Sequence, residues 1–313
     1  MISRARHRIS LVAIGILALV AGVLAATFGL PDRVADAAAG ADDAQTAQIR
    51  ELTAERDGLA ARADAGDRFA AGVGPGVVRG KLTGVPVTLV TVGGDPAGTD
   101  ADTTAVADLV TAAGGSVAGR VRLTDAVTDP AKADQLRDLS ARLLPAGAQL
   151  PATSESGTLA GGLLGSVLLT PAEGPAPDPG QAQAVLAGLA GAGFAEAPAA
   201  PPAPGRLAVV VTGGAAQGVD AGASAASLAR MATELDRHGG TVLAGRSGSA
   251  VPDGPVGAAR TDDANSAGLS TVDDVDTASG RIATVLALGE QKDGRSGRYG
   301  SGPGAAGPVP ALG

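Results

Sequence analysis

Two stretches of the chain repeat the same order of apolar and polar positions. Residues 206–249 hold a continuous apolar run, a Thr-Gly-Gly turn, a segment with apolar residues at helical spacing and a second short apolar run. Residues 85–124 show the same order, and the two copies end alike, in GGSVAGR and GGTVLAGR. A continuous apolar run is typical of a strand that is buried on both faces of a parallel sheet. Each copy therefore predicts a β-α-β module, and the repetition indicates a duplication.

The helical segment of each module carries apolar side chains every three or four residues, which places them on one face of a helix. They are Val106, Leu109, Val110 and Ala113 in the first copy, and Leu228, Met231, Ala232 and Leu235, followed by His238, in the second. Two adjacent glycines end each segment. We therefore predict an α/β body of two related Rossmann-like lobes, residues 72–194 and 206–290, with a mostly parallel sheet.

Further elements are indicated by capping residues and short apolar runs. Asp129 and Asp178 are each followed by proline, an N-cap and first-turn pair that predicts the start of a helix. Residues 159–169 are apolar and contain three glycines; their periodicity fits a buried helix or a strand, and we expect a helix. We expect strands at residues 256–260 and, fully buried, at residues 282–288.

Two segments of unusual composition bound the second lobe. Residues 195–205, AEAPAAPPAPG, contain four prolines and favour extended polyproline geometry, so we expect a semi-rigid linker or a long exposed loop between the lobes. Residues 291–313 are rich in glycine and proline, which predicts a disordered tail.

The N-terminus carries the strongest hydrophobic signal. Residues 1–8 contain three arginines, and residues 9–30 are 22 consecutive uncharged residues. That length spans a hydrocarbon core of roughly 30 Å at about 1.5 Å per residue. We expect a retained transmembrane anchor with a cytoplasmic N-terminus and an exported body. Ala-x-Ala motifs at residues 35–37 and 37–39 keep a cleaved signal segment as the alternative.

A polar, helix-favouring segment follows at residues 31–71. Its apolar positions approach the a and d spacing of a heptad repeat, with Arg56 in one seam position: Ile49, Leu52, Leu59 and Ala63. We predict a stalk helix that forms a short coiled coil, which would give a homo-oligomer or present a face to another protein. Because the seam is short, a single solvated helix is the alternative.

Composition and charge narrow the classes of function. The net charge is −8, and beyond the first eight residues the basic side chains are scattered among acidic ones, so we expect no nucleic-acid partner. The chain has no cysteine, which excludes disulfides, thiolate metal sites and a cysteine nucleophile. With three Phe, one Tyr and no Trp, the core must be built from Ala, Val and Leu.

Catalytic and cofactor-binding motifs are incomplete. The turn TGGAAQG supplies Gly213, Ala215 and Gly218 where a dinucleotide fingerprint has three glycines, so the central glycine that admits the pyrophosphate is missing. No GxxxxGK[ST] or GxSxG motif occurs, and His238 is the single histidine beyond the leader. We therefore expect no enzyme activity, no catalytic residues and no bound cofactor, and interpret the turn as structural.

Two groups of side chains are candidates for metal ligands. Met231 and His238 lie seven residues apart on one predicted helix face, and Asp273, Asp274 and Asp276 form an acidic cluster. A tight copper or zinc site collects several soft or imidazole ligands, and the acidic cluster lacks the EF-hand pattern. Packing against the sheet and a solvated acidic turn are the respective alternative interpretations.

Several short motifs together carry a family resemblance that extends from the N-terminal anchor to the tail. They are LLPAG at 143–147, VTGG at 211–214, LAGR at 243–246, STVDDVD at 270–276 and YG at 299–300. With them the chain resembles the mycobacterial copper transport protein MctB family and its actinobacterial relatives.

This resemblance implies a cell-envelope protein described as channel-forming, which acts in copper efflux and resistance and has copper as its transported substrate. Its location would be the membrane that the anchor spans or, after signal cleavage, the outer mycolic membrane. Corynebacterial relatives are also similar to an envelope protein of cell division, whose membrane-proximal coiled coil engages a peptidoglycan hydrolase system. The alternative function is therefore an envelope scaffold or regulator of wall hydrolysis and division that acts through its stalk on a cell-wall or division protein.

Overall fold

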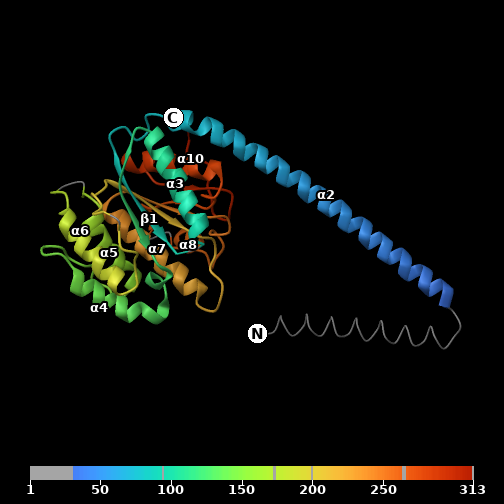
Figure 1. The fold of residues 1–313 in the computed structure, drawn as a ribbon, viewed down its shortest axis with the longest axis horizontal. Helices are drawn as coiled ribbons and strands as arrows, with labels where there is room; N and C mark the ends of the chain where they lie inside the picture. Colours follow the sequence, from blue (N-terminus) through green and yellow to red (C-terminus); the bar gives the residue numbers. More distant parts are fainter. Residues whose placement is uncertain (1–30, 94, 172–173, 199, 263–265, 312–313) are drawn as a thin grey trace. The chain divides into compact units, whose positions relative to one another are not determined.

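The computed structural model describes residues 31–93, 95–171, 174–198, 200–262 and 266–311 (Figure 1). The chain divides into two compact units, Met1–Ala65 and Gly66–Gly313. The predicted cytoplasmic segment, residues 1–8, and the predicted anchor, residues 9–30, lie outside the described residues. Within the described part of the chain, none of the helices is long and apolar enough to cross a membrane.

The predicted stalk is a helix, α2 (Pro31–Val77), which is 47 residues long. In the first unit the apolar side chains of its predicted seam are exposed to solvent, with relative exposures of 59% for Ile49, 56% for Leu52 and 56% for Leu59. The helix is confirmed, and the coiled coil stays a prediction.

The second unit is built on one sheet of six parallel strands in the order β2-β1-β3-β4-β5-β6. The strands are β1 Pro86–Val92, β2 Ser116–Leu123, β3 Leu207–Thr212, β4 Thr241–Gly245, β5 Ser270–Val272 and β6 Arg298–Tyr299. The first module contributes β1 and β2, and the second contributes β3 and β4. Because β1 pairs directly with β3, from Val87 opposite Leu207 to Val92 opposite Thr212, the two modules are halves of one sheet and the prediction of two lobes is corrected.

Helices cover both faces of this sheet (Figure 1). One face packs against α3 Pro96–Ala112 and α10 Ala278–Lys292. The other packs against α4 Ala133–Leu143, α5 Ser156–Leu168, α6 Pro179–Gly191, α7 Ala221–His238 and α8 Pro255–Thr261. Short 3-10 turns, η1 Asp125–Val127 and η2 Pro130–Lys132, precede α4. Neighbouring residues of β3 enter opposite cores, which confirms that its continuous apolar run is buried on both faces.

Several predicted helix features are confirmed. The apolar face of α7 is buried at Leu228, Met231, Ala232 and Leu235. Asp129 and Asp178 accept hydrogen bonds from backbone amides two residues further on, as N-caps do. The glycine-containing run is helix α5, and Gly161 lets it approach α7 closely, because a Cβ atom there would lie 2.6 Å from the Met231 carbonyl oxygen.

Two predicted strands are helices instead. Residues 256–260 belong to α8, and residues 282–288 belong to α10, whose N-cap Thr277 accepts a hydrogen bond from the Gly280 amide. The sequence pattern was misleading because α10 is buried on nearly all sides, so its apolar residues form a continuous run without a polar face.

The proline-rich segment, residues 195–205, does not separate two bodies. Ala195 forms a bridge with Leu123, and the Ala203 amide donates to the Ala118 carbonyl at 3.1 Å. The segment therefore runs beside β2 and covers an edge of the sheet that would otherwise present unpaired backbone groups.

The C-terminal tail is ordered where it is described, up to residue 311, which corrects the prediction of disorder. Its anchor is Arg260, which is 7% exposed. The guanidinium donates to Thr271 Oγ1 at 3.0 Å, Asp273 Oδ2 at 2.6 Å, the Pro303 carbonyl at 2.8 Å and the Tyr299 carbonyl at 2.7 Å. The other oxygen of Asp273 accepts from the amides of Ser301 and Gly302, both at 2.9 Å. The tail was predicted to be disordered because its sequence has few apolar residues. Its order comes instead from the buried ion pair between Arg260 and Asp273.

This network also secures an unusual connection. The strand order advances in one direction from β3 to β6, yet α10 crosses on the face opposite to α7 and α8. The last crossover therefore has the opposite hand to the two before it, and one hand accounts for about 98% of such connections. Since β6 has two residues, its ladder is short, and the contacts of Arg260 fix the strand in place.

We predict that Arg260→Met loosens the tail and destabilises the body by about 3–5 kcal/mol, because Asp273 is left buried and unpaired. Chemical denaturation and amide hydrogen exchange at residues 301 and 302 measure the two effects. Arg260→Met/Asp273→Asn should recover part of the loss. Arg137→Met, which removes an exposed pair with Asp134, should cost under about 1 kcal/mol. Unchanged exchange at 301 and 302 in Arg260→Met would refute the anchoring role.

Candidate functional site

The strand order changes direction between β1 and β3, and a crevice opens at the carboxyl ends of these two strands. From β1 the chain continues into α3 on one face, and from β3 it continues into α7 on the other. In open α/β sheets this switch point is where ligands bind. Here it holds a cleft of about 440 Å³, within the roughly 300–1,000 Å³ of small-molecule sites.

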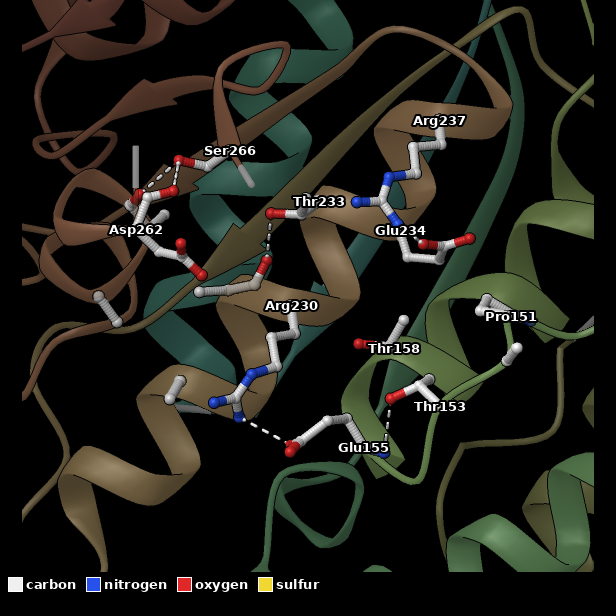
Figure 2. Close-up of a pocket in the computed structure, with 15 residues that line it drawn as sticks. Pro151, Thr153, Glu155, Thr158, Arg230, Thr233, Glu234, Arg237, Asp262 and Ser266 are labelled. Carbon is white, nitrogen blue, oxygen red and sulfur yellow. Dashed lines mark hydrogen bonds and ion pairs between the residues drawn. The ribbon is translucent and has the colours of Figure 1, made fainter. Parts of the chain in front are cut away.

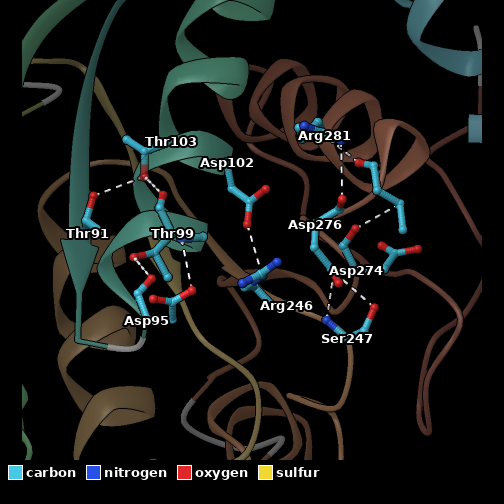
Figure 3. A network of polar contacts seen from close by, with 12 residues as sticks. Thr91, Asp95, Thr99, Asp102, Thr103, Arg246, Ser247, Asp274, Asp276 and Arg281 are labelled. Atoms are coloured by element: carbon cyan, nitrogen blue, oxygen red, sulfur yellow. Dashed lines mark hydrogen bonds and ion pairs between the residues drawn. The ribbon is translucent and has the colours of Figure 1, made fainter. Parts of the chain in front are cut away.

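Helix α3, whose N-cap Asp95 lines the crevice, is held to β1 by buried threonine side chains (Figure 3). Asp95 caps α3 by accepting from the Gly98 amide at 3.3 Å. Thr99 Oγ1 donates to the Asp95 carbonyl, Thr103 Oγ1 donates to the Thr99 carbonyl, and the hydroxyls of Thr103 and Thr91 lie 3.0 Å apart. These bonds fix the first turns of α3, and with them the position of Asp95 at the crevice.

Arg246 lies directly after β4 and lines the crevice. Its amide donates to the Thr212 carbonyl at 3.2 Å, and its Nε lies 3.2 Å from Asp102 Oδ2 (Figure 3). A Cβ atom on Gly98 would lie 2.0 Å from Nη1, so a larger residue there would displace the guanidinium from its present position. Within the described part of the chain, neither Nη1 nor Nη2 of Arg246 has a hydrogen-bond partner.

Asp102 supports this guanidinium from a buried position. Its side chain is 6% exposed, against 32% for Arg246. Burial raises the pKa of Asp102 above its ordinary value, and the nearby Arg246 and Arg281 oppose that rise. Arg246 Nε therefore forms an ion pair with Asp102 Oδ2, although this oxygen accepts no hydrogen bond in the described structure, and the two terminal nitrogens are left for a ligand.

The rest of the polar lining is acidic. Asp95, Asp125 and Asp253 all line the crevice and are exposed. Since Asp102 balances the charge of Arg246, the crevice carries an excess of negative charge. A polyphosphate is disfavoured there, in keeping with the missing central glycine of the turn at residues 212–218, whose first residues form another part of the lining.

A second cleft, of about 480 Å³, lies among α5, α7 and α8 (Figure 2). Each of its arginines is matched by a glutamate: Arg230 Nη1 lies 3.1 Å from Glu155 Oε2, and Arg237 Nη1 donates to Glu234 Oε2 at 2.7 Å. Because these charges are already paired, the second cleft has fewer charged groups available for a ligand than the crevice has.

The structure places the predicted soft-metal ligands in separate packing roles. Met231 is 1% exposed in the core beneath α7. His238 Nδ1 lies 3.0 Å from the Glu234 carbonyl, and the ring covers Gly165, where a Cβ atom would lie 2.5 Å from Cγ. Both residues therefore take the packing role that was the alternative interpretation.

The three aspartates of the acidic cluster are also engaged differently. Asp273 pairs with Arg260, and Asp276 Oδ1 accepts from the amide of Ser247 at 2.8 Å and its hydroxyl at 3.0 Å. Asp274 Oδ1 is buried without a hydrogen-bond partner in the described structure. No group of three or more His, Cys, Asp or Glu side chains is arranged to hold a metal ion among the described residues.

Sequence reasoning missed the pair of Asp102 and Arg246. A signal was present, because Asp95, Thr99 and Asp102 follow one another at helical spacing on a face of α3 that would otherwise be apolar. The repeated ending in Gly-Arg after each module also marks residue 246, although it does not reveal the partner.

We predict that Asp274→Asn stabilises the protein at about pH 8 and has little effect near pH 4. Burial, followed by the charges of Asp273 and Asp276, raises the pKa of Asp274 to about 6. Because the folded pKa exceeds the unfolded one, wild-type stability falls as pH rises from about 4 through 6. Denaturation midpoints of both proteins across this range test the prediction. A constant difference at every pH would contradict it.

Comparison with known proteins adds the family. The family model described as "Copper transport outer membrane protein, MctB" matches residues 1–310. Proteins named "Copper transporter MctB" from Mycobacterium bovis and Mycobacterium tuberculosis are 38% identical over 312 residues, which covers 97% of this chain and 98% of theirs. The protein of the same name from Mycobacterium leprae is 40% identical over 233 residues, 70% of this chain and 72% of that one. This chain therefore belongs to the MctB family.

Proposed function

We propose that this protein acts in copper efflux and copper resistance at the cell envelope. The observation that carries the proposal is the match to relatives named copper transporters along 97% of the chain. The family description, which names an outer membrane protein, supports the envelope location. In this proposal copper is the cargo, and the protein needs neither a catalytic centre nor a resident cofactor.

Within this proposal, copper is moved without capture by Met231 and His238. Met231 is enclosed by the core, and His238 is occupied with the end of its own helix. Copper that bound these side chains would have to displace packing between α5 and α7. A channel would then be formed by association of several chains, for which α2 offers the contact surface.

Deletion of the gene should raise cellular copper and copper sensitivity, and the wild-type gene should restore both. Met231→Leu/His238→Gln should restore them equally well, because Leu for Met conserves volume and neither side chain serves as a ligand. Elemental analysis of cells and growth at graded copper concentrations measure the outcome. Unchanged copper content in the deletion strain would reject the transport function. Failure of the double variant, at normal protein level, would instead reject passage without these ligands.

An envelope scaffold or regulator of wall hydrolysis and division is the second candidate. It is favoured by the three exposed apolar side chains Ile49, Leu52 and Leu59 on α2, which follow heptad spacing. Such a face is stabilised by pairing with another helix, either from a second copy of the chain or from a wall or division protein.

Leu52→Asp/Leu59→Asp should abolish this pairing, because it places charge in the seam. Ala54→Asp/Ala61→Asp is the matched control, since it adds the same charge to exposed positions outside the seam. A photo-crosslinker at residue 49 should capture a partner or a second copy in wild type and in the control, and not in the seam variant. If the seam variant also has normal septation and cell shape, the scaffold function is rejected.

A further inference from the structure

The crevice between the ends of β1 and β3 presents hydrogen-bond donors on Arg246 that no described residue satisfies, and exposed carboxylates in its lining. The terminal nitrogens of Arg246 have no hydrogen-bond partner in the described structure, and its Nε lies 3.2 Å from Asp102 Oδ2. A guanidinium fork binds carboxylate or carbonyl oxygens, and bidentate binding is the strongest form. This part of the crevice therefore selects an oxygen acceptor.

The carboxylates around the crevice favour a positively charged group on the ligand. Asp95 and Asp253 are exposed carboxylates in the lining. An ammonium group gains from these carboxylates, whereas a ligand that carries only negative charge is repelled. Between these polar groups the lining is apolar at Val92, Ala225 and Leu228, which suits small aliphatic side chains.

We propose that this crevice binds an amino acid or short peptide. The ligand's ammonium group faces the acidic lining, and its carboxylate or carbonyl oxygen accepts from Arg246. The volume of about 440 Å³ admits two or three residues with small side chains. This role is separate from copper transport, and it rests on the fold and the side chains of the crevice alone.

The direct test is calorimetric titration of the purified full-length protein in detergent with three related probes. Tri-alanine carries both charges, its N-acetyl derivative lacks the ammonium group, and its C-terminal amide lacks the carboxylate. We expect saturable binding of tri-alanine, with N-acetylation weakening it by about tenfold or more and amidation weakening it less, because the amide keeps a carbonyl acceptor.

Variants then assign the contacts. Arg246→Lys keeps a positive charge beside Asp102 and removes the guanidinium fork. It should therefore weaken the binding of tri-alanine by about tenfold and reduce the difference in affinity between tri-alanine and its C-terminal amide. Asp253→Asn should reduce the difference in affinity between tri-alanine and the N-acetyl probe. Arg230→Lys, in the second cleft, should leave both differences in affinity unchanged. Absence of saturable binding for all three probes, or equal affinities in wild type and Arg246→Lys, would overturn the proposal.

Discussion

The pairing of β1 with β3 is the constraint on which the rest of the body depends. Each β-α-β module exposes a strand edge that must be paired, and the two modules satisfy each other through this contact. Because the connections after β1 and β3 leave on opposite faces, the same pairing creates the crevice. It also places Asp95 and Arg246, from different modules, beside one cavity. The ladder between β1 and β3 therefore determines both the single sheet and its candidate site.

The sequence predicted the elements whose burial is one-sided or whose ends are chemically marked. The apolar face of α7, the capping aspartates 129 and 178, and the doubly buried β3 are of this kind. Prediction failed for α10, since burial on nearly all sides removes the polar face that distinguishes a helix. It failed again for the tail, whose order depends on Arg260, about forty residues before the carbonyls that it binds. Contacts of that separation leave no local pattern.

The candidate site was less predictable than the fold. Met231, His238 and the three aspartates were candidates because of their residue types alone. In the structure they make separate contacts and do not form a shared site. No sequence motif contains Arg246 and Asp102. The fold brings them together, because it places the end of β4 beside α3. Family membership supports a role with copper, while the crevice suggests a ligand of a different chemistry. The two functions can be separated experimentally, because they rest on different parts of the molecule.

The most direct test of the central claim is amide hydrogen exchange of the full-length protein with and without tri-alanine. Three segments that are far apart in the sequence line the crevice: one through Val92 and Asp95, one through residues 212–216, and one through Arg246 and Asp253. The account predicts that all three segments gain protection together, and that Arg246→Lys reduces the gain in all of them. Protection confined to one segment, or absent from all three at saturating tri-alanine, would contradict the single-sheet crevice as a peptide site.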